Sequence, residues 1–237
     1  MYRNFLFDLD GTLLPMDLKK FIKLYLGAFC TRFSPVTETD PKILVDAIWQ
    51  GAAAMAKNDG QCLNSVLFWK AMNSVCGREM RCFEQLFDDF YHNEFAKARE
   101  ATGVNPAAAE MVRLIKERGG RAVVATNPIF PMSATYTRIR WAGLDPNDFD
   151  YITVYDNSSS CKPNLNYYEN VCSFCGFELE ETVMIGNDVD EDMCASRLGL
   201  GVYLVTDCLI NRDNKDISRY KNGSLEDCLG WIRSLGA

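Results

Sequence analysis

The sequence predicts an α/β protein, a doubly wound parallel sheet with an inserted helical cap domain. Two observations support this fold class. The first is a set of five short, nearly continuous apolar runs, the pattern of strands buried on both faces of a parallel sheet. The second is the alternation of the later runs with helical patterns, after one long helical stretch. The runs span residues 3–7, 121–126, 151–155, 182–186 and 201–205.

The long helical stretch lies between the first strand and the rest of the sheet. From residue 15 to about residue 100 the chain shows no strand pattern and at least four helical patterns. Asp40 and Pro41 begin one helix, and Gly60 lies beyond its end. A later helix carries aromatic residues at helical spacing, which indicates core packing. The predicted domains are the α/β core, residues 1–14 and 101–237, and the helical cap, residues 15–100.

Capping residues mark the helices between the later strands. Asn105 and Pro106 begin the first, because Asn is a favoured N-cap and Pro fits the first helical position. Gly119 ends that helix. The next helix ends at Gly143, and the last two are predicted from about Asn164 to Cys175 and from near Asp190 to Gly199.

Composition excludes several classes of partner. The 237 residues carry a net charge of −7 with no long basic block, so we expect no nucleic-acid partner. No apolar run approaches the ~18 residues that span a bilayer, so we expect no membrane association. No secretory leader is evident, and we expect a cytoplasmic protein whose ten cysteines stay reduced. We interpret the Cys172–Cys175 pair as helix packing and the single histidine, His92, as a surface or packing residue.

Polar residues follow four of the predicted strands. Because the carboxyl ends of parallel strands share one edge of the sheet, these side chains should converge there. They are Asp8 and Asp10, then Thr126 and Asn127, then Lys162, then Asn187, Asp188, Asp190 and Asp192. A convergence of this kind from four separate segments indicates a functional site.

The residue types at this edge indicate phosphate chemistry. Clustered carboxylates repel one another unless a cation lies among them, and an all-oxygen site favours Mg²⁺. Lys162 would add positive charge and Thr126 a hydroxyl donor for an anionic substrate. Asp8 and Asp10 lie two positions apart in extended chain and so point the same way. One of them can attack phosphorus while the other transfers a proton.

The order of these residues resembles the four motifs of the haloacid dehalogenase superfamily. The matching segments are Asp8-Leu9-Asp10-Gly11-Thr12, Thr126-Asn127, Lys162-Pro163, and Gly186-Asn187-Asp188 with Asp192. The resemblance covers residues 1–14 and about 105–206. Family members with a helical insertion directly after the first motif use it as a mobile cap, which matches residues 15–100.

The resemblance implies a role for each matched residue. Asp8 would be the nucleophile and Asp10 the general acid and base. The substrate phosphate would be held by Thr126, Asn127 and Lys162, and Lys162 would also neutralise the developing charge.

The resemblance also implies a Mg²⁺ site. Asp8, the backbone carbonyl of Asp10 and Asp188 would bind the metal, and Asp192 would support it or orient Lys162. Asn187 separates Gly186 from Asp188, which departs from the commonest form of the motif. The choice among Asp188, Asp190 and Asp192 is therefore open, and we prefer Asp188 with Asp192 in support.

The leading hypothesis is a Mg²⁺-dependent phosphatase that acts on a small phosphorylated metabolite through an aspartyl-phosphate on Asp8. The 2-haloacid dehalogenases of the superfamily need no Mg²⁺ and lack the second aspartate, so Asp10 counts against that activity. A sugar-phosphate mutase or a phosphonate hydrolase on the same scaffold, and a catalytically silent binding protein, remain alternatives. The sequence does not indicate an oligomeric state.

Overall fold

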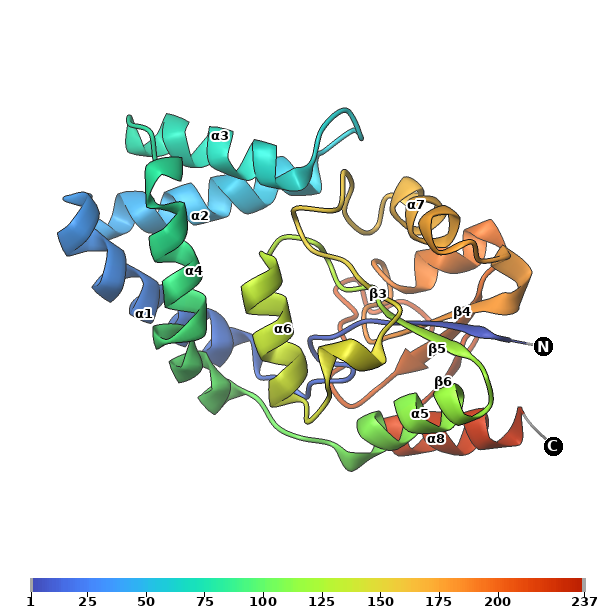
Figure 1. Cartoon of the computed structure of the whole chain (residues 1–237). Coiled ribbons are helices and arrows are strands. Elements are labelled where there is room, and N and C mark those ends of the chain that lie inside the picture. The colour runs from blue at the N-terminus through green and yellow to red at the C-terminus, as the bar shows by residue number, and fades with distance from the viewer. Residues whose placement is uncertain (1, 236–237) are drawn as a thin grey trace.

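The fold is built on six parallel strands. The computed structural model describes residues 2–235 (Figure 1). The strand order of the sheet is β3-β2-β1-β4-β5-β6. The chain reverses its direction of winding at β1, which places the ligand-binding edge of the sheet beside the end of that strand. The strands are β1 (Asn4–Phe7), β2 (Arg121–Val124), β3 (Tyr151–Ile152), β4 (Thr182–Gly186), β5 (Gly201–Val205) and β6 (Lys221–Gly223). The doubly wound sheet predicted from the sequence is confirmed.

Helices cover both faces of the sheet. The side chains of Phe5 and Phe7 point to one face, where α5 (Pro106–Glu117) packs beside α8 (Leu225–Ser234). Leu6 points to the other face and packs with residues of α7 (Leu165–Cys175). This alternation buries β1 on both sides and explains why its sequence is continuously apolar.

Four helices make up the insertion after β1, which we call the helical insertion (residues 15–100). They are α1 (Leu18–Thr37), α2 (Pro41–Ala56), α3 (Asn64–Cys76) and α4 (Glu84–His92), with 3₁₀ turns at Arg81–Phe83 and Glu94–Ala101. Its core is aromatic, since the ring centroids of Phe29 and Phe33 lie 4.2 Å apart and those of Phe33 and Phe87 4.4 Å apart. The aromatic residues Phe87, Phe90 and Tyr91 of α4 are buried in this core, which confirms the core packing that their helical spacing indicated.

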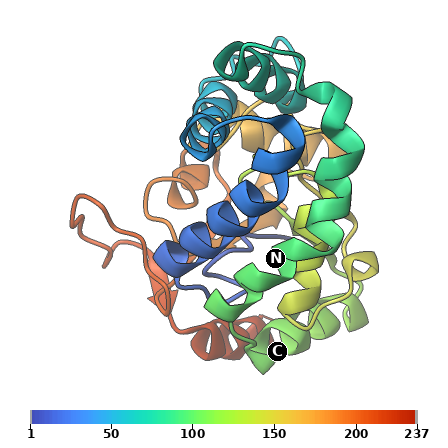
Figure 2. The same cartoon turned by 90° about the vertical axis from the view of Figure 1, so that its left-hand side faces the viewer.

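The insertion is connected to the sheet domain by two neighbouring segments. The backbone N–H of Asp17 donates to the carbonyl of Ala101 at 2.9 Å, and that of Gly103 donates to the carbonyl of Pro15 at 2.8 Å. The chain therefore leaves and returns at one place, close to the carboxyl end of β1. Figure 2 shows α2 and α3 at one end of the molecule and α8 at the opposite end.

A buried asparagine fastens the insertion to the core at a second place. The Asn64 amide nitrogen donates to the carbonyl of Pro128 at 3.1 Å, and its oxygen accepts from the Asn58 side chain at 2.8 Å. The backbone N–H of Asn64 donates to the carbonyl of Ser158 at 2.8 Å. Asn64 is fully buried, so these bonds have no competing water.

We expect Asn64→Ala to lower the free energy of unfolding by about 1–3 kcal/mol, because it leaves buried polar groups without a partner. Val66→Ala, on the exposed side of the same helix, is the control and should stay within about 0.5 kcal/mol of the parent. Urea titration measures both values. Equal stability of the two variants would show that the Asn64 contacts do not hold the insertion on the core.

The structure differs from the sequence-based expectations in the last third of the chain. The sequence pattern predicts a helix from Asp190 to Gly199, but the structure has a turn followed by a 3₁₀ helix at Met193–Leu198. The reason is that the Asp188 carboxylate accepts the backbone N–H groups of Asp190 and Glu191, which fixes a turn. Strand β6 and helix α8 were not predicted. Within residues 2–235, no helix has the length and apolar character that crossing a membrane requires.

Candidate active site

Lys162 joins two carboxylates at the carboxyl edge of the sheet. Its Nζ donates to Asp8 Oδ1 at 2.9 Å and to Asp192 Oδ1 at 2.7 Å. The lysine is only 3% exposed, so the pairs are shielded from solvent. Burial lowers the pKa of Lys162, but the carboxylates of Asp192 and Asp8 outweigh it and leave that pKa well above its usual value. The ammonium group therefore stays charged beside Asp8.

The turn after β1 brings a hydroxyl group to Asp8. Thr12 Oγ1 lies 3.3 Å from Asp8 Oδ2 and 3.0 Å from Asn187 Oδ1, so its single proton can serve either oxygen. Gly11 has a φ of +88°, and a Cβ there would collide with the Asn187 amide. The left-handed backbone and the close Asn187 amide both require glycine at position 11.

Asp10 pairs with a buried arginine that the sequence analysis did not identify. Arg138, on α6 (Met132–Trp141), is 1% exposed, and its guanidinium contacts Asp10 Oδ2 and lies 4.4 Å from the centroid of the Phe130 ring. Burial raises the pKa of Asp10, although Arg138 opposes the shift. Its other oxygen, Oδ1, is buried without a hydrogen-bond partner within residues 2–235. Arg138 lies on the buried face of its helix together with Ala134 and Ile139. An arginine at helical spacing with apolar residues is the sequence pattern that could have indicated a buried arginine.

Thr126 and Asn127 reach the same edge from the end of β2. The carbonyl of Thr126 accepts from the Thr153 hydroxyl at 2.7 Å and from the Tyr167 hydroxyl at 2.8 Å. These two bonds hold the orientation of the peptide group that follows Thr126. The Asn127 amide nitrogen donates to Glu191 Oε2 at 3.0 Å. Glu191 is therefore a further carboxylate of the site.

The three aspartates after β4 have different partners. Asp188 Oδ2 accepts from Arg212 Nη1 at 2.8 Å. The side chain of Asp192 accepts from Lys162 and, at 2.9 Å, from the backbone N–H of Asp188. Asp190 instead pairs with Lys215. These contacts favour Asp192 as the residue that orients Lys162. Asp190 lies outside the group that surrounds Asp8, because it pairs with Lys215.

The donor chemistry fits a hard divalent cation. Asp8 and Asp188 offer oxygen ligands without thiolate or imidazole, the set that Mg²⁺ prefers. Burial raises the pKa of Asp8 most strongly, and Lys162 opposes that shift. The negative charges of Asp10 and Glu191 raise the pKa further. A cation would relieve this repulsion, and the Arg212 guanidinium already provides one positive charge at Asp188. Residues 2–235 contain no preassembled group of three or more potential side-chain ligands.

Fold and site together define a class of protein: an α/β protein whose carboxylates and buried lysine meet at the carboxyl edge of a parallel sheet, next to a helical insertion. A family model described as haloacid dehalogenase-like hydrolase matches residues 2–197. The chain therefore belongs to the haloacid dehalogenase-like hydrolases.

Solved structures share this fold over almost the whole chain. A HAD phosphatase from Thermococcus onnurineus is 17% identical with a TM-score of 0.60, and 98% of each chain is covered. The putative HAD-hydrolase YfnB from Bacillus subtilis, bound to magnesium, is 20% identical with a TM-score of 0.59, covering 98% of this chain and 99% of that one. A 2-haloacid dehalogenase from Pseudomonas syringae pv. Tomato DC3000 is 16% identical with a TM-score of 0.64, and both chains are fully covered. The curated proteins gave no match.

Proposed function

We propose that the protein is a Mg²⁺-dependent phosphatase that hydrolyses a small phosphorylated metabolite through an aspartyl-phosphate on Asp8. The observation that carries the proposal is the pair of acids after β1. Asp8 is held by the buried ammonium of Lys162, while Asp10 has a separate partner in Arg138. Each acid thus has its own buried cation, and burial raises the pKa of both. The separate partners support separate roles, nucleophile for Asp8 and proton donor for Asp10.

The two acids divide the reaction between them. An Asp8 oxygen attacks phosphorus, the P–O bond to the alcohol breaks, and Asp10 gives its proton to the departing oxygen. Asp10 then takes a proton from a water molecule, which attacks phosphorus and releases phosphate and the free Asp8 carboxylate. Lys162 neutralises charge on the transferred group, and Thr126 and Asn127 hold its oxygens.

Three groups are proposed to hold the metal: the side chains of Asp8 and Asp188 and the backbone carbonyl of Asp10, with Asp192 in support. When bound, Mg²⁺ would supply positive charge for the phosphoryl oxygens and orient them. The Arg212 side chain is about half exposed, so it can leave Asp188 for solvent. We propose in addition that residues 15–100 act as a cap that closes over the substrate and excludes water.

Dehalogenation is the competing reaction within the family, since solved dehalogenases share the fold as fully as phosphatases do. The presence of Asp10 supports the phosphatase. A displacement of halide needs no proton donor for its leaving group, whereas the release of an alcohol does. The ion pair with Arg138 keeps Asp10 beside the reacting edge.

We expect the purified protein to hydrolyse an aryl phosphate only with a divalent cation, because the clustered carboxylates repel an anionic substrate. EDTA should abolish hydrolysis, and Mg²⁺ should restore it. Calorimetric titration with Mg²⁺ gives a readout that does not depend on turnover, and Asp188→Asn should weaken that binding. Full activity in EDTA, or release of chloride from 2-chloropropionate without phosphatase activity, would contradict the proposed function.

A further inference from the structure

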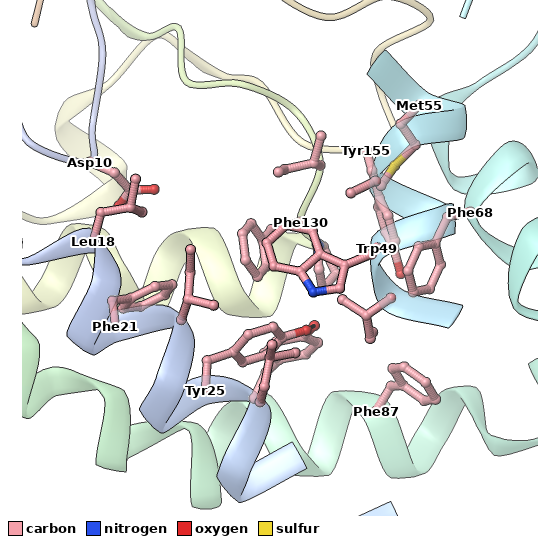
Figure 3. Close-up of a pocket in the computed structure, with 17 residues that line it drawn as sticks. Asp10, Leu18, Phe21, Tyr25, Trp49, Met55, Phe68, Phe87, Phe130 and Tyr155 are labelled. Atoms are coloured by element: carbon pink, nitrogen blue, oxygen red, sulfur yellow. Dashed lines mark hydrogen bonds between the residues drawn. The ribbon is translucent and has the colours of Figure 1, made fainter. Parts of the chain in front are cut away.

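A largely apolar cavity of about 180 Å³ lies between the helical insertion and the α/β core. Figure 3 shows Asp10 at one end, near Leu18, with Met55 and Phe68 at the other end. Aromatic rings form much of the wall, and they come from α1, α2, α3, α4 and the loop before α6. Among them are Phe21, Tyr25, Trp49, Phe68, Phe87 and Phe130. The cavity is thus built from segments that are far apart in the sequence.

Among the described residues, Asp10 is the only charged one that lines this cavity. The polar groups of the wall are few, and the hydroxyls of Tyr25 and Tyr91 lie 3.1 Å apart and bond to each other. A sugar placed here would bury hydroxyl groups with few partners, which is unfavourable. An apolar group would instead leave water for a matching surface. The wall therefore selects against polyhydroxylated compounds.

The position of Asp10 connects the cavity to the reaction. In the proposed function Asp10 protonates the departing alcohol, so the alcohol must lie on the Asp10 side of the phosphorus atom. Asp10 itself lines the cavity, whereas Asp8 and Lys162 do not. The phosphoryl group therefore belongs among Asp8, Lys162 and Thr126, and the alcohol belongs in the cavity.

We propose that the substrate is the phosphate monoester of an apolar alcohol that carries a single ring. This inference rests on the proposed function and adds its substrate class. A single ring fits the volume, since an apolar cavity of ~150 Å³ accepts benzene. A cavity of about 180 Å³ holds one ring with a short linker to the ester oxygen.

Three alkyl phosphates with leaving groups of comparable basicity test the proposal: 2-phenylethyl phosphate, ethyl phosphate and glycerol 1-phosphate. The full chain is assayed with Mg²⁺, and kcat/KM is compared. We expect 2-phenylethyl phosphate to exceed each of the other two by roughly 10–100-fold, as expected for burying one ring-sized apolar group. Equal kcat/KM values for the three esters, or preference for glycerol 1-phosphate, would overturn the apolar site and leave the phosphatase intact.

Two neighbouring alanines on α2 provide a matched pair of variants. Ala52 lines the cavity, while Ala53 is exposed to solvent. Ala52→Trp should reduce the preference for 2-phenylethyl phosphate over ethyl phosphate to within about threefold of unity, because its ring fills the space. Ala53→Trp should keep the preference of the parent. If Ala52→Trp fails to fold, Ala52→Leu takes its place and should lower the preference by a smaller factor. An unchanged preference in a folded Ala52 variant would overturn the proposal.

Binding without turnover separates this inference from the proposed function. Trp49 lines the cavity and is half exposed, so 2-phenylethanol should shift its fluorescence at saturating concentration, and Trp49→Phe should remove that shift. If all phosphates, including aryl phosphates, stay intact, the proposed function fails and the substrate assignment fails with it. Saturable binding of 2-phenylethanol would then still establish the cavity as an apolar binding site. Absence of binding would overturn the apolar binding site as well.

Discussion

Asp8→Asn is expected to lower the kcat of aryl-phosphate hydrolysis by at least roughly 10⁴-fold, the scale seen when a catalytic nucleophile is removed. An amide is a poor nucleophile at phosphorus, so no aspartyl-phosphate forms. The fold should survive, because Asp192 still pairs with the Lys162 ammonium at 2.7 Å. The loss of activity therefore reports on chemistry and not on stability.

The matched control for Asp8→Asn is Asp190→Asn. The Asp190 carboxylate pairs with Lys215, away from Lys162 and Asp8, so its loss should change kcat by no more than a few-fold. Circular dichroism melting checks that both variants are folded. Substantial activity in Asp8→Asn would show that another group attacks the substrate, and a collapse of activity in Asp190→Asn would bring Asp190 back as a metal ligand.

Asp10→Asn should separate the two half-reactions. A phenolate that is stable as an anion leaves without a proton, so the variant should still transfer phosphate to Asp8 and release a burst of phenolate equal to the enzyme concentration. The second step needs a base to activate water, and steady turnover should fall by roughly 10²–10⁴-fold. The carboxamide oxygen introduced by this substitution can still accept a hydrogen bond from Arg138, which preserves the local contact.

Rapid mixing with 4-nitrophenyl phosphate measures both phases of the Asp10→Asn reaction. Calorimetry with Mg²⁺ is the control, since the proposed ligand at this position is the backbone carbonyl and the affinity should not change. An Asp10→Asn variant that turns over like the parent would show that Asp10 is not the acid and base. A variant without burst and without turnover would show that Asp10 is needed already for the first step.

Topology made it predictable that Asp8 and Lys162 lie at the same edge of the sheet. Residues that follow parallel strands share one edge of the sheet wherever the loops run. The Asp8–Lys162 contact joins positions that are 154 residues apart in the chain, and the loop between β3 and α7 carries Lys162 the rest of the way to Asp8. The aromatic interior of the insertion was predictable for a similar reason, since helical spacing alone defines the buried face.

Other partners of the site depend on loop conformation, which periodicity does not determine. Arg212 reaches Asp188 from the segment after β5, and Glu191 reaches Asn127 through a turn that the Asp188 carboxylate stabilises. Strand β6 is an exposed three-residue edge strand without an apolar pattern, so its sequence shows no strand signal. The cavity beside Asp10 combines side chains from the insertion and the core, and only the folded arrangement reveals that its wall is apolar.

The proposed function rests on a phosphoryl group that is transferred to Asp8. Acid quenching of the Asp10→Asn variant during turnover of an aryl phosphate, followed by proteolysis and mass spectrometry, tests this directly. We predict a phosphorylated N-terminal peptide with the modification on Asp8, sensitive to hydroxylamine as an acyl phosphate is, and absent from Asp8→Asn treated in the same way. Hydrolysis that proceeds without phosphorylation of Asp8, or a phosphoryl group found on another residue, would contradict the proposed mechanism.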